Sequence, residues 1–423
     1  MDKDTTVIIG GGLQGLATAY CLLHKGEKVL LLERNDDVAR EASFANAGMI
    51  TPSHSTPWNS FSDIVQIFSG IGRKDSPMLL NLRYLPSMFF WGLRFLRNSS
   101  KSRFLRNSQH SYQLAKYSKQ ITKETRLKNG LSYDDAQNGT MKIFRDKSKL
   151  DQSIEITKKY SDSSIDMKIL DQKGVVEVEP ALADISDHLA GGILYPEDEI
   201  GDAYKFCKEL ENLIRTQGGR IHVNTEIKKI LVYKNSINGL LTDRVEIRAK
   251  AIVLAAGSWS REILKQLKLN LPVRPVKGYS LTHQSGGLKN CPEIAILDES
   301  THTAITPLGK RIRVTGVAEF TGLDDDIHID RVDYLNNMLL SVYPKLYSQL
   351  TLAEGKAWCG FRPMSYDGLP YIGETKIKGL YVNVGQGHLG WTKAMGSASL
   401  LSDIMLGNKT AINPKPYLAN RSL

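Results

Sequence analysis

The first 34 residues combine two short apolar runs with one helical stretch between them. Thr5–Ile9 and Lys28–Leu32 are rich in β-branched and aliphatic side chains, as strands buried on both faces are. Leu13–Lys25 gathers its apolar side chains on one face, which is typical of a helix packed on a sheet. The order strand, helix, strand predicts a right-handed crossover and a Rossmann-like parallel sheet.

Two segments far along the chain return to the buried-strand pattern. Residues 250–257 (KAIVLAAG) and 379–385 (GLYVNVG) are apolar and end in glycine, and a helix is predicted from about Trp391 to Leu406. We therefore expect one α/β domain that is built from separated pieces of the chain. The insertions would form a second domain with a mixed or antiparallel sheet, so that the overall class is α+β.

The insertions contain both helical and strand-like stretches. One helical stretch is expected over residues 61–129, with breaks near Gly70 and Pro86. Between residues 273 and 316 the pattern alternates as in strands, without a long helix. Asp202 is placed to cap a helix over residues 203–216. Shorter strands are expected at residues 140–144, 189–195, 220–223 and 227–232.

This interleaved pattern leads to expected domain bounds. The dinucleotide-binding domain would comprise residues 1–75, 190–262 and 365–423, and the substrate-binding domain residues 76–189 and 263–364. Residues 35–58 lack periodicity and are rich in Ala, Ser, Asn and Gly. A loop of that length inside a compact domain usually has a function, and a surface Ω-loop is the alternative.

Composition narrows the class of protein. Hydrophobic residues make up 41% of the chain and charged residues 24%, which excludes disordered and fibrous proteins. The net charge of +10 favours anionic partners such as phospholipid head groups, nucleic acid or carboxylate substrates. The four cysteines form no CxxC pair, so we expect no metal or iron–sulfur site and a reducing compartment. No long apolar run or signal peptide is evident, and we expect a cytoplasmic protein, with possible peripheral binding to the cytoplasmic face of the inner membrane.

The turn after the first apolar run carries the first chemical motif. Gly10, Gly12 and Gly15 form GxGxxG between a predicted strand and a predicted helix, and Glu33 ends the second strand. Gly10 permits the tight turn, Gly12 lets backbone N–H groups approach a pyrophosphate, and Gly15 lets the helix pack on the strand. A dinucleotide site is therefore predicted, in which the Glu33 carboxylate accepts from a ribose hydroxyl.

NAD and FAD share this motif, and a second strand helps to choose between them. Residues 250–257 end in Ala255, Ala256 and Gly257 on the far side of the expected sheet. A strand end there can contact a long FAD molecule that lies across the domain. An ordinary core strand is the alternative.

Six segments in one order identify a family. They are VIIGGGLQGLATAYCLLHKG, LLLER, SFANAGMITP, PVKGYSLT, GFRPMSYDGLPYIG and GQGHLGWTKAMGSASLLSD, and together they extend from residue 5 to about residue 407. In this series the chain resembles the D-amino acid oxidase superfamily of flavoproteins, most closely its bacterial D-amino acid dehydrogenase branch. The SFANAG, KGYSLT and HLGWT segments are more specific than the glycine motif.

The resemblance implies a non-covalent FAD whose flavin ring lies between the two domains. The small-residue loop would pass beside the ring, and the turn before the last helix would lie under its pyrimidine edge. The residues expected to contact FAD are Gly10, Gly12, Leu13, Gln14, Gly15, Glu33, Arg34, Ser43, Ala45, Asn46, Ala47, Gly48, Met49, Ile227, Ala255, Ala256, Gly257, Gly387, His388, Leu389, Gly390, Trp391 and Thr392.

The same resemblance implies three residues around the substrate. Arg362 would hold the substrate carboxylate, because a guanidinium meets a carboxylate with two parallel hydrogen bonds. A structural ion pair with Asp367 is the alternative. Tyr279 would hydrogen-bond or enclose the substrate, and Met49 would form an apolar wall, with core packing as its alternative.

Two positions depart from the family pattern or leave a choice open. The related dehydrogenases usually read Gly-His-Gly-Thr where this chain has Gly385, Gln386, Gly387 and His388. The histidine is displaced, so we expect this turn to bind flavin mainly through its backbone. Some family members attach FAD through a cysteine near the GFRP motif, and Cys359 lies beside it, although the D-amino acid dehydrogenases do not use such a link.

The activity implied is oxidative deamination of a D-amino acid such as D-alanine, by hydride transfer to flavin and onward to a quinone. Residues 78–106 interleave aromatic and basic side chains, which favours contact with a membrane interface, and a buried amphipathic helix is the alternative. An oxygen-using oxidase of glycine, sarcosine or a D-amino acid remains the second hypothesis. An RNA-directed flavoenzyme is a third, although the basic residues are dispersed and no RNA-binding module is evident.

Overall fold

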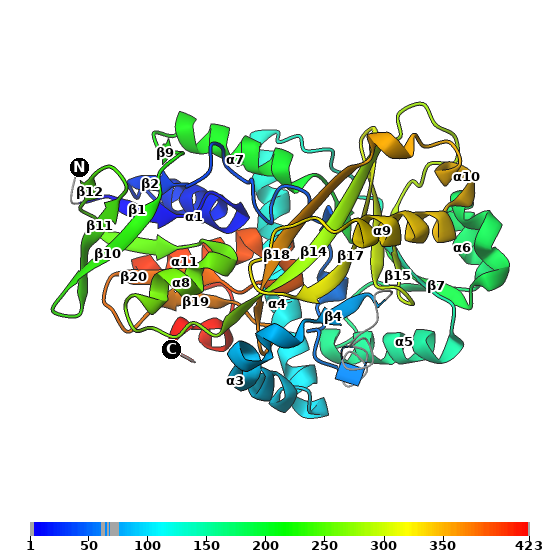
Figure 1. Cartoon of the computed structure of the whole chain (residues 1–423), viewed down its shortest axis with the longest axis horizontal. Helices are drawn as coiled ribbons and strands as arrows, with labels where there is room; N and C mark the ends of the chain where they lie inside the picture. Colours follow the sequence, from blue (N-terminus) through cyan, green and yellow to red (C-terminus); the bar gives the residue numbers. More distant parts are fainter. Residues whose placement is uncertain (1–3, 61–63, 66, 68–75, 422–423) are drawn as a thin grey trace.

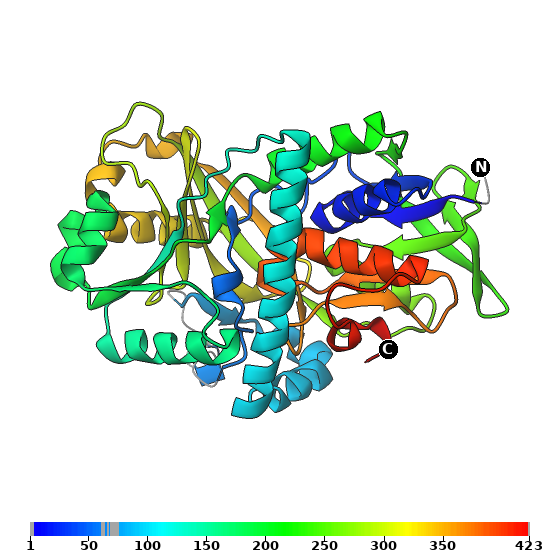
Figure 2. The same cartoon turned by 180° about the vertical axis from the view of Figure 1, so that it is seen from behind.

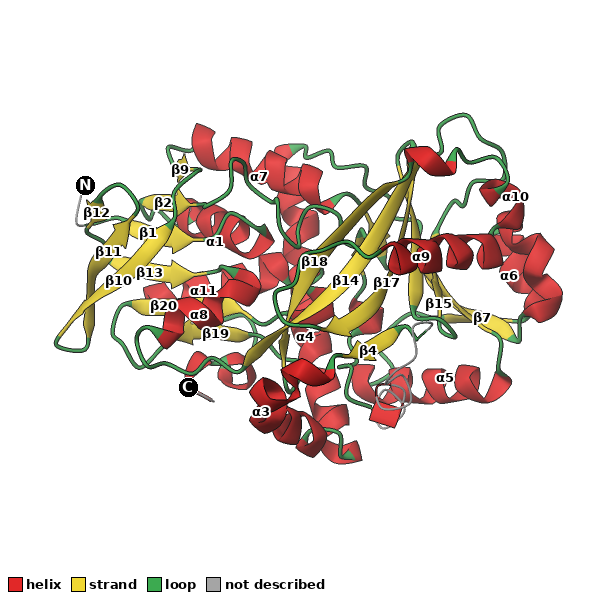
Figure 3. Cartoon of the chain, in the orientation of Figure 1, coloured by secondary structure: helices red, strands yellow, loops and turns green. Residues whose placement is uncertain are grey.

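A computed structural model describes residues 4–60, 64–65, 67 and 76–421 of the chain, and the break expected near Gly70 lies outside them. Two sheets lie side by side, and both ends of the described part of the chain belong to the half that contains β1 (Figure 1). This organisation, with parallel and antiparallel sheets in the two halves (Figure 3), confirms the predicted α/β class.

The first sheet is the expected dinucleotide-binding sheet. Its strand order is β19-β20-β13-β1-β2-β9, and β19 alone runs antiparallel to its neighbour in this described sheet. The register places Val7 beside Leu30 and Ile252, and all three side chains are buried. The strands are β1 (Thr6–Ile9), β2 (Val29–Leu32), β9 (Arg220–His222), β13 (Ala251–Leu254), β19 (Tyr371–Glu374) and β20 (Leu380–Val384).

Both faces of this sheet are covered, as the continuous apolar strands require. Three helices pack on one face, and their apolar side chains share a core with alternate residues of β1, β2 and β13. A small antiparallel sheet covers the other face through Ile230, Leu240 and Ile247. The helices are α1 (Leu13–His24), α7 (Ala203–Thr216) and α11 (Ala394–Leu406), and the small sheet comprises β10 (Ile227–Tyr233), β11 (Ser236–Thr242) and β12 (Glu246–Ile247).

The second sheet is mixed, with the described order β18-β14-β17-β16-β15-β5-β7-β6 and β4 beside β17. One face packs on α6 (Gln172–Val178) and α9 (Ile329–Val342) in a separate core. Near α5 (Lys147–Ser161), the other face lines a cavity. The strands are β4 (Met78–Leu80), β5 (Thr140–Phe144), β6 (Lys168–Leu170), β7 (Gly191–Tyr195), β14 (Val273–Gln284), β15 (Ala295–Asp298), β16 (Thr303–Leu308), β17 (Arg311–Phe320) and β18 (Lys356–Ser365).

One long helix, α4 (Lys101–Asn129), crosses the boundary between the two halves (Figure 2). The backbone N–H of Gly396 in α11 donates to Ser118 Oγ at 2.9 Å, so α4 is fastened to the first half. On the other side Tyr112 shares a hydrogen bond of 2.8 Å with Ser164, just beyond α5. The helix therefore braces the two halves against each other.

Several sequence predictions of local structure are confirmed. The opening βαβ unit is present, and α7 begins at the expected cap, where the Asp202 carboxylate accepts from the N–H groups of Tyr204 and Lys205. The strands expected at residues 140–144, 220–223 and 227–232 are β5, β9 and β10.

The expectation for residues 61–129 was wrong in part. The break expected near Pro86 is present, because α3 (Leu85–Arg97) begins there with Pro86 in its first turn, where its missing N–H costs nothing. The chain also leaves the helical path at residues 98–100, and Met78–Leu80 is not helical but forms β4 by pairing with β17.

We keep the two interleaved domains as a proposal, with one boundary moved. Residues 191–195 fall within the range assigned to the dinucleotide-binding domain, but β7 hydrogen-bonds to β5 and β6 of the second sheet. The chain first re-enters the dinucleotide-binding half at α7, after the short strand β8 (Glu199–Ile200).

Candidate active site

A cavity of about 1160 Å³ lies between the two sheets. It begins where β1, β2 and β13 end and continues to the face of the second sheet near α5. Ligands of open α/β sheets bind at these carboxyl ends. Its volume is above the usual range of about 300–1000 Å³ for small-molecule sites, which suits a large cofactor together with a substrate.

The glycine turn brings two strand ends close together. Gly10 has φ of +108°, and a Cβ there would stand 2.7 Å from the Ala255 carbonyl oxygen. A Cβ on Gly15 would stand 1.8 Å from the Gly10 carbonyl oxygen, so only glycine lets α1 start here. Gly15 does not line the cavity and acts through this packing. The N–H of Leu13 at the start of α1 donates to Ser43 Oγ at 3.0 Å.

Glu33 is held at the cavity edge by the backbone. Its Oε2 accepts from the N–H of Gly11 at 2.6 Å, and its Oε1 accepts from the N–H of Asn35 at 2.9 Å. Each carboxylate oxygen has a second lone pair, which leaves capacity for ribose hydroxyl groups. The neighbouring Arg34 guanidinium lies 4.2 Å from the centre of the Trp259 ring, and both side chains line the cavity.

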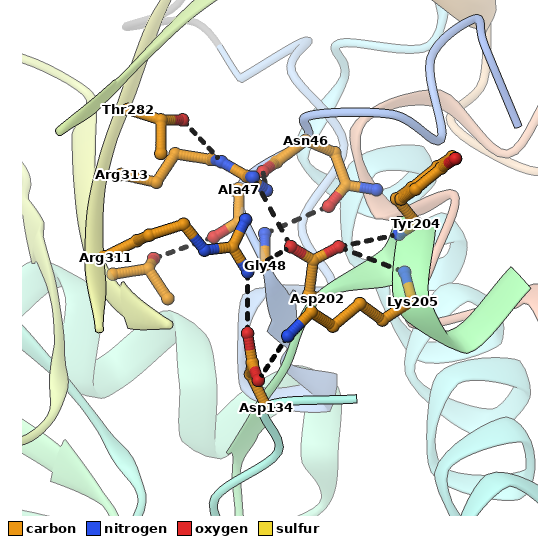
Figure 4. A network of polar contacts seen from close by, with 11 residues as sticks. Asn46, Ala47, Gly48, Asp134, Asp202, Tyr204, Lys205, Thr282, Arg311 and Arg313 are labelled. Atoms are coloured by element: carbon orange, nitrogen blue, oxygen red, sulfur yellow. Dashed lines mark hydrogen bonds and ion pairs between the residues drawn. The ribbon is translucent and has the colours of Figure 1, made fainter. Parts of the chain in front are cut away.

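The small-residue loop is held from the second sheet (Figure 4). Arg313 donates from Nη1 to the Asn46 carbonyl oxygen at 3.1 Å, and Thr306 donates to the Ala47 carbonyl oxygen at 2.7 Å. The Asn46 side chain accepts from the N–H of Gly48, whose φ is +71°. The loop carbonyls are thus turned toward the protein, and Ser43 and Ala45–Met49 line the cavity.

Two arginines of β17 connect this loop with the cap of α7. Arg311 donates to Asp202 at 2.8 Å and to Asp134 at 2.6 Å. Arg313 lies 3.6 Å from the same Asp202 oxygen and is only 4% exposed in its side chain. Burial lowers the pKa of Arg313 to about 10, and Asp202 opposes that shift. We call Arg311, Arg313, Asp202 and Asp134 the domain latch, because they connect both halves.

The turn before the last helix closes the cavity from the first half. The His388 ring stacks on Trp58 with 4.8 Å between ring centres. Burial lowers the pKa of His388 to about 3, and the nearby Lys393 adds to the shift, so the imidazole is neutral at physiological pH. Gln386 is buried and donates to Asn383 at 2.7 Å. Gly387–Trp391 line the cavity, as do Gln14, Ile227 and Ala255–Gly257.

Thr392 is the one residue of the predicted FAD set, besides Gly15, that does not line the cavity. Its Oγ1 accepts from the N–H of Thr51 at 3.0 Å, which fixes the loop beside the last helix. Both residues therefore support the site through packing.

Arg362 reaches the cavity from β18. Its Nη1 donates to the Val317 carbonyl oxygen at 3.0 Å, and its Cζ lies 5.2 Å from the centre of the Trp58 ring. A Cβ on Gly278 would stand 2.1 Å from Nη1, so that glycine makes the space in which the guanidinium lies. Burial lowers the pKa of Arg362 to about 10.

No carboxylate of the described residues forms an ion pair with Arg362. Asp367, the partner considered from the sequence, instead pairs with Arg421 at 3.4 Å. A half-buried guanidinium without a counterion is unfavourable unless a ligand supplies the charge. The carboxylate of a small substrate would meet that requirement.

Tyr279 and Met49 have different positions relative to the cavity. The Tyr279 hydroxyl donates to Glu319 Oε2 at 3.1 Å, and Glu319 in turn pairs with Arg331 at 2.6 Å. The Tyr279 side chain thus lies in the core that packs on α9, on the opposite face of β14 from Gly278 and Arg362, and Tyr279 borders the cavity without pointing into it. Burial raises the pKa of its hydroxyl. Met49, on β3 (Met49–Ile50), lines the cavity as predicted for an apolar wall.

Cys359 lies between two cavity-lining residues but does not itself line the cavity. Its side chain packs on the core that holds α9, and its thiol donates to the Asp325 carbonyl oxygen at 3.1 Å. Burial raises the pKa of the Cys359 thiol. The thiol therefore faces away from the predicted flavin position.

The sequence did not identify several residues that line the cavity. His54 and Trp58 lie at the end of the small-residue loop, and Lys142 and Tyr160 come from β5 and α5. An aromatic residue at the end of a functional loop was the available signal for Trp58. The sequence contains no signal that Lys142 lines a site, because a single lysine in a strand is ordinarily solvated.

The residues that line the cavity fit FAD. The glycine turn leaves space for a pyrophosphate, Glu33 is placed for a ribose, and the cavity continues from there past the small-residue loop to Arg362.

Among the described residues, no group of three or more His, Cys, Asp or Glu side chains is placed to hold a metal ion. None of the described helices combines the length and apolar character that crossing a membrane requires.

The chain is similar to known proteins along its whole length. The sequence model of a family described as DAO, FAD dependent oxidoreductase, matches residues 5–404. A D-amino acid dehydrogenase of Rhizobium johnstonii is 35% identical over 415 residues, which cover 98% of this chain and 99% of the relative. A D-amino acid dehydrogenase of Bradyrhizobium diazoefficiens is 35% identical over 418 residues, which cover 98% of each chain.

Solved structures share the fold at lower sequence identity. A glycine oxidase from Bacillus cereus aligns with a TM-score of 0.75 and 22% identity, over 99% of both chains. An L-proline dehydrogenase from P. horikoshii aligns with a TM-score of 0.76 and 18% identity, over 99% of this chain and 98% of the other. At these identities the likeness concerns the fold alone.

Proposed function

The chain belongs to the DAO family of FAD-dependent oxidoreductases, and we propose that it oxidatively deaminates a D-amino acid such as D-alanine. The prediction of an FAD enzyme is confirmed by the family match. The observation that carries the substrate proposal is Arg362, a cavity-lining guanidinium without a carboxylate partner in the described structure. Two relatives with 35% identity, both named D-amino acid dehydrogenase, support the same substrate class.

Arg362 would orient the substrate through its carboxylate. Its Nη1 already donates to Val317, and the remaining N–H groups of the fork can bind two carboxylate oxygens. The ring of Trp58 lies beside the guanidinium and limits where the substrate side chain can go. The α-carbon is thereby held at one position in the cavity.

FAD, when bound, supplies the two-electron acceptor for oxidation of the α-carbon. The substrate amine must be unprotonated for its lone pair to assist, and water then hydrolyses the imino acid to a 2-oxo acid and ammonia. His388 stays neutral next to this centre and therefore adds no positive charge that would oppose the oxidation. The N–H groups of the turn at Gly387–Gly390 would stabilise negative charge at the edge of the cofactor.

We further propose that the electrons pass to a quinone at a membrane surface on the cytoplasmic side. The helix α3 supports this, since Phe89 and Phe90 are 59% and 79% exposed beside exposed Arg94 and Arg97. Its opposite side packs in the protein through Met88, Trp91 and Phe95. Apolar side chains next to basic ones are the pattern of a peripheral membrane contact.

Anaerobic bleaching of the bound flavin tests the substrate proposal. D-alanine should bleach the flavin, while L-alanine, glycine and sarcosine should do so more slowly. Bleaching by L-alanine or glycine in preference to D-alanine would contradict the proposal.

Reoxidation of the bleached enzyme tests the acceptor. A soluble quinone should restore the flavin colour faster than air, with little hydrogen peroxide. Rapid peroxide formation in air would instead identify an oxygen-using oxidase.

A further inference from the structure

One arm of the cavity extends from Arg362 along the second sheet. Along β5 the side chains alternate: Met141 and Ile143 point into the core that holds α6 and α9, and Lys142 points to the opposite face. That face and α5 enclose the arm, whose walls include Ile156, Thr157 and Tyr160 of α5. The walls of this arm come from β5 and α5, and not from the glycine turn or the small-residue loop that would hold FAD.

Lys142 carries a positive charge in this arm. Its side chain is only 12% exposed, and its one ion pair in the described structure, with Glu299 Oε2, has an N···O distance of 3.8 Å. That distance is too long for a hydrogen bond. A largely buried ammonium without a close acceptor is unfavourable, so a ligand with an anionic group would be stabilised there.

Lys142 and Arg362 belong to the same enclosed region. Both act electrostatically on His388, whose ring stacks on Trp58. Trp58 in turn lies beside the Arg362 guanidinium, so both cations and both rings belong to one part of the cavity. Glu299 is the one carboxylate that pairs with either cation among the described residues.

Alanine fills only the first part of this space. With its carboxylate on Arg362, its methyl group would lie near Trp58 and leave Lys142 without a partner. A side chain that ends in a carboxylate would follow the rings and reach the ammonium, giving one charge-assisted hydrogen bond at each end of the substrate.

We propose that Lys142 binds an anionic group on the substrate side chain, so that acidic D-amino acids, such as D-glutamate and D-aspartate, are the preferred substrates. This inference rests on the proposed deamination of D-amino acids and narrows its substrate class. It requires no change in the chemistry at the α-carbon, because Lys142 acts at the far end of the substrate.

The test is anaerobic flavin reduction of the FAD-loaded enzyme with D-glutamate, D-aspartate, D-glutamine, D-leucine and D-alanine. The wild-type enzyme should reduce fastest, at equal low concentration, with an acidic substrate. Lys142→Met should raise the apparent Kd for D-glutamate about ten- to hundredfold, as expected for the loss of a charge-assisted bond. The Kd for D-alanine should change less than about twofold, and Lys142→Arg should restore most of the binding of D-glutamate.

Two further variants sharpen the test. Glu299→Gln removes the carboxylate that competes for Lys142 and should lower the Kd for D-glutamate. Lys149→Met, at the exposed rim of the same arm, should leave the ratio of the two Kd values unchanged.

The outcomes separate this inference from the proposed function. Reduction by D-alanine or D-leucine in preference to D-glutamate would overturn the inference alone. An equal loss of D-alanine and D-glutamate binding in Lys142→Met would do the same, because Lys142 would then only attract carboxylates in general or support the fold. Reduction by no D-amino acid would overturn the proposed function, and the inference with it.

Discussion

At the scale of single residues, neither Arg362 nor Lys393 forms an ion pair with a carboxylate of the described structure. Arg362 faces the cavity, whereas Lys393 is 1% exposed and donates only to the Gly368 carbonyl oxygen at 3.3 Å. Burial lowers the pKa of both groups, to about 10 for Arg362 and to about 7 for Lys393. The first group can gain a partner from the substrate, and the second cannot.

Arg362→Met should raise KM for the amino acid about a hundredfold with a smaller change in kcat, because the guanidinium binds the carboxylate in the ground state and the transition state alike. Gly278→Ala provides a matched test in which the arginine remains. Its Cβ would overlap the guanidinium, so KM should rise there too. Steady-state kinetics with a soluble quinone measures both, and an unchanged KM in Arg362→Met would refute the assignment.

Lys393 makes stability depend on pH in a defined direction. Between about pH 7 and the ordinary pKa of lysine, the folded protein binds fewer protons at this amine than the unfolded chain. The free energy of unfolding therefore rises with pH across that window. The stabilisation is lost again as the pH falls toward 7, where the folded protein also protonates this amine. Lys393→Met should raise the Tm more at pH 6 than at pH 9.5.

Thermal unfolding at the two pH values checks this prediction. Lys409→Met, which changes an exposed lysine, is the control and should shift the Tm equally at both. The same parallel shift in Lys393→Met would show that the buried amine is not the origin.

At the scale of elements, the domain latch connects the start of α7, the strand β17 and the small-residue loop (Figure 4). Asp202 has two roles, since it caps α7 with one oxygen and meets Arg311 with the other. Arg313 is the member that touches the loop beside the predicted flavin position. The two arginines can therefore be separated by mutation.

Arg313→Met should weaken FAD binding about tenfold, because it releases the Asn46 carbonyl and loosens the loop. Arg311→Met is the matched control: it removes the ion pairs with Asp134 and Asp202 but leaves the loop contact. It should lower the Tm without a comparable loss of FAD. Flavin fluorescence titration of the apoprotein measures the affinity, and equal losses in both variants would contradict a specific role for Arg313.

The exposed side of α3 makes a second prediction at this scale. The protein should float with vesicles that contain anionic lipid, and less so at high salt, because the arginines are screened. Phe89→Ser with Phe90→Ser should reduce flotation without changing the Tm, since both side chains are exposed. Absence of flotation by the wild-type protein would refute the membrane contact.

Local patterns predicted local elements well and long-range ones poorly. The βαβ unit and the Asp202 cap depend on neighbouring residues, and both are as expected. β4 depends on pairing with β17, more than two hundred residues later, and its sequence alone reads as part of a helical stretch. β7 has the apolar pattern of either sheet, and its pairing with β5 decides which one it joins.

The same distinction holds for the site. The segments predicted to contact FAD, and Arg362, were recognised from motifs, and nearly all of their residues line one cavity. Trp58 and Lys142 lie in no motif, and their place depends on how the second sheet and α5 pack around the cavity. The direction of the Tyr279 hydroxyl likewise depends on Glu319, which lies on a neighbouring strand.

At the scale of the whole molecule, the cavity separates two independent cores that are connected by α4 and the domain latch. A cofactor that contacts both halves should therefore stabilise the fold as a unit. Removal of FAD should lower the Tm, and FAD at a free concentration of 100 times Kd should add about 2.7 kcal/mol to the free energy of unfolding.

Differential scanning calorimetry over an FAD concentration series measures this effect. Riboflavin lacks the pyrophosphate and adenosine that the glycine turn and Glu33 are placed to bind, so it should raise the Tm less at equal concentration. An equal effect of riboflavin would show that the glycine turn contributes no binding energy.

The interleaving of the first sheet also sets an order of events during protein synthesis. β1 leaves the ribosome first, yet one of its two neighbours is β13, and β13 is flanked by β20 near the end of the chain. At about 5–20 residues per second, the apolar edge of β1 waits on the order of tens of seconds for that partner. We expect the nascent chain to depend on chaperones during this interval, and the cavity is not complete until Gly387–Trp391 have also been made.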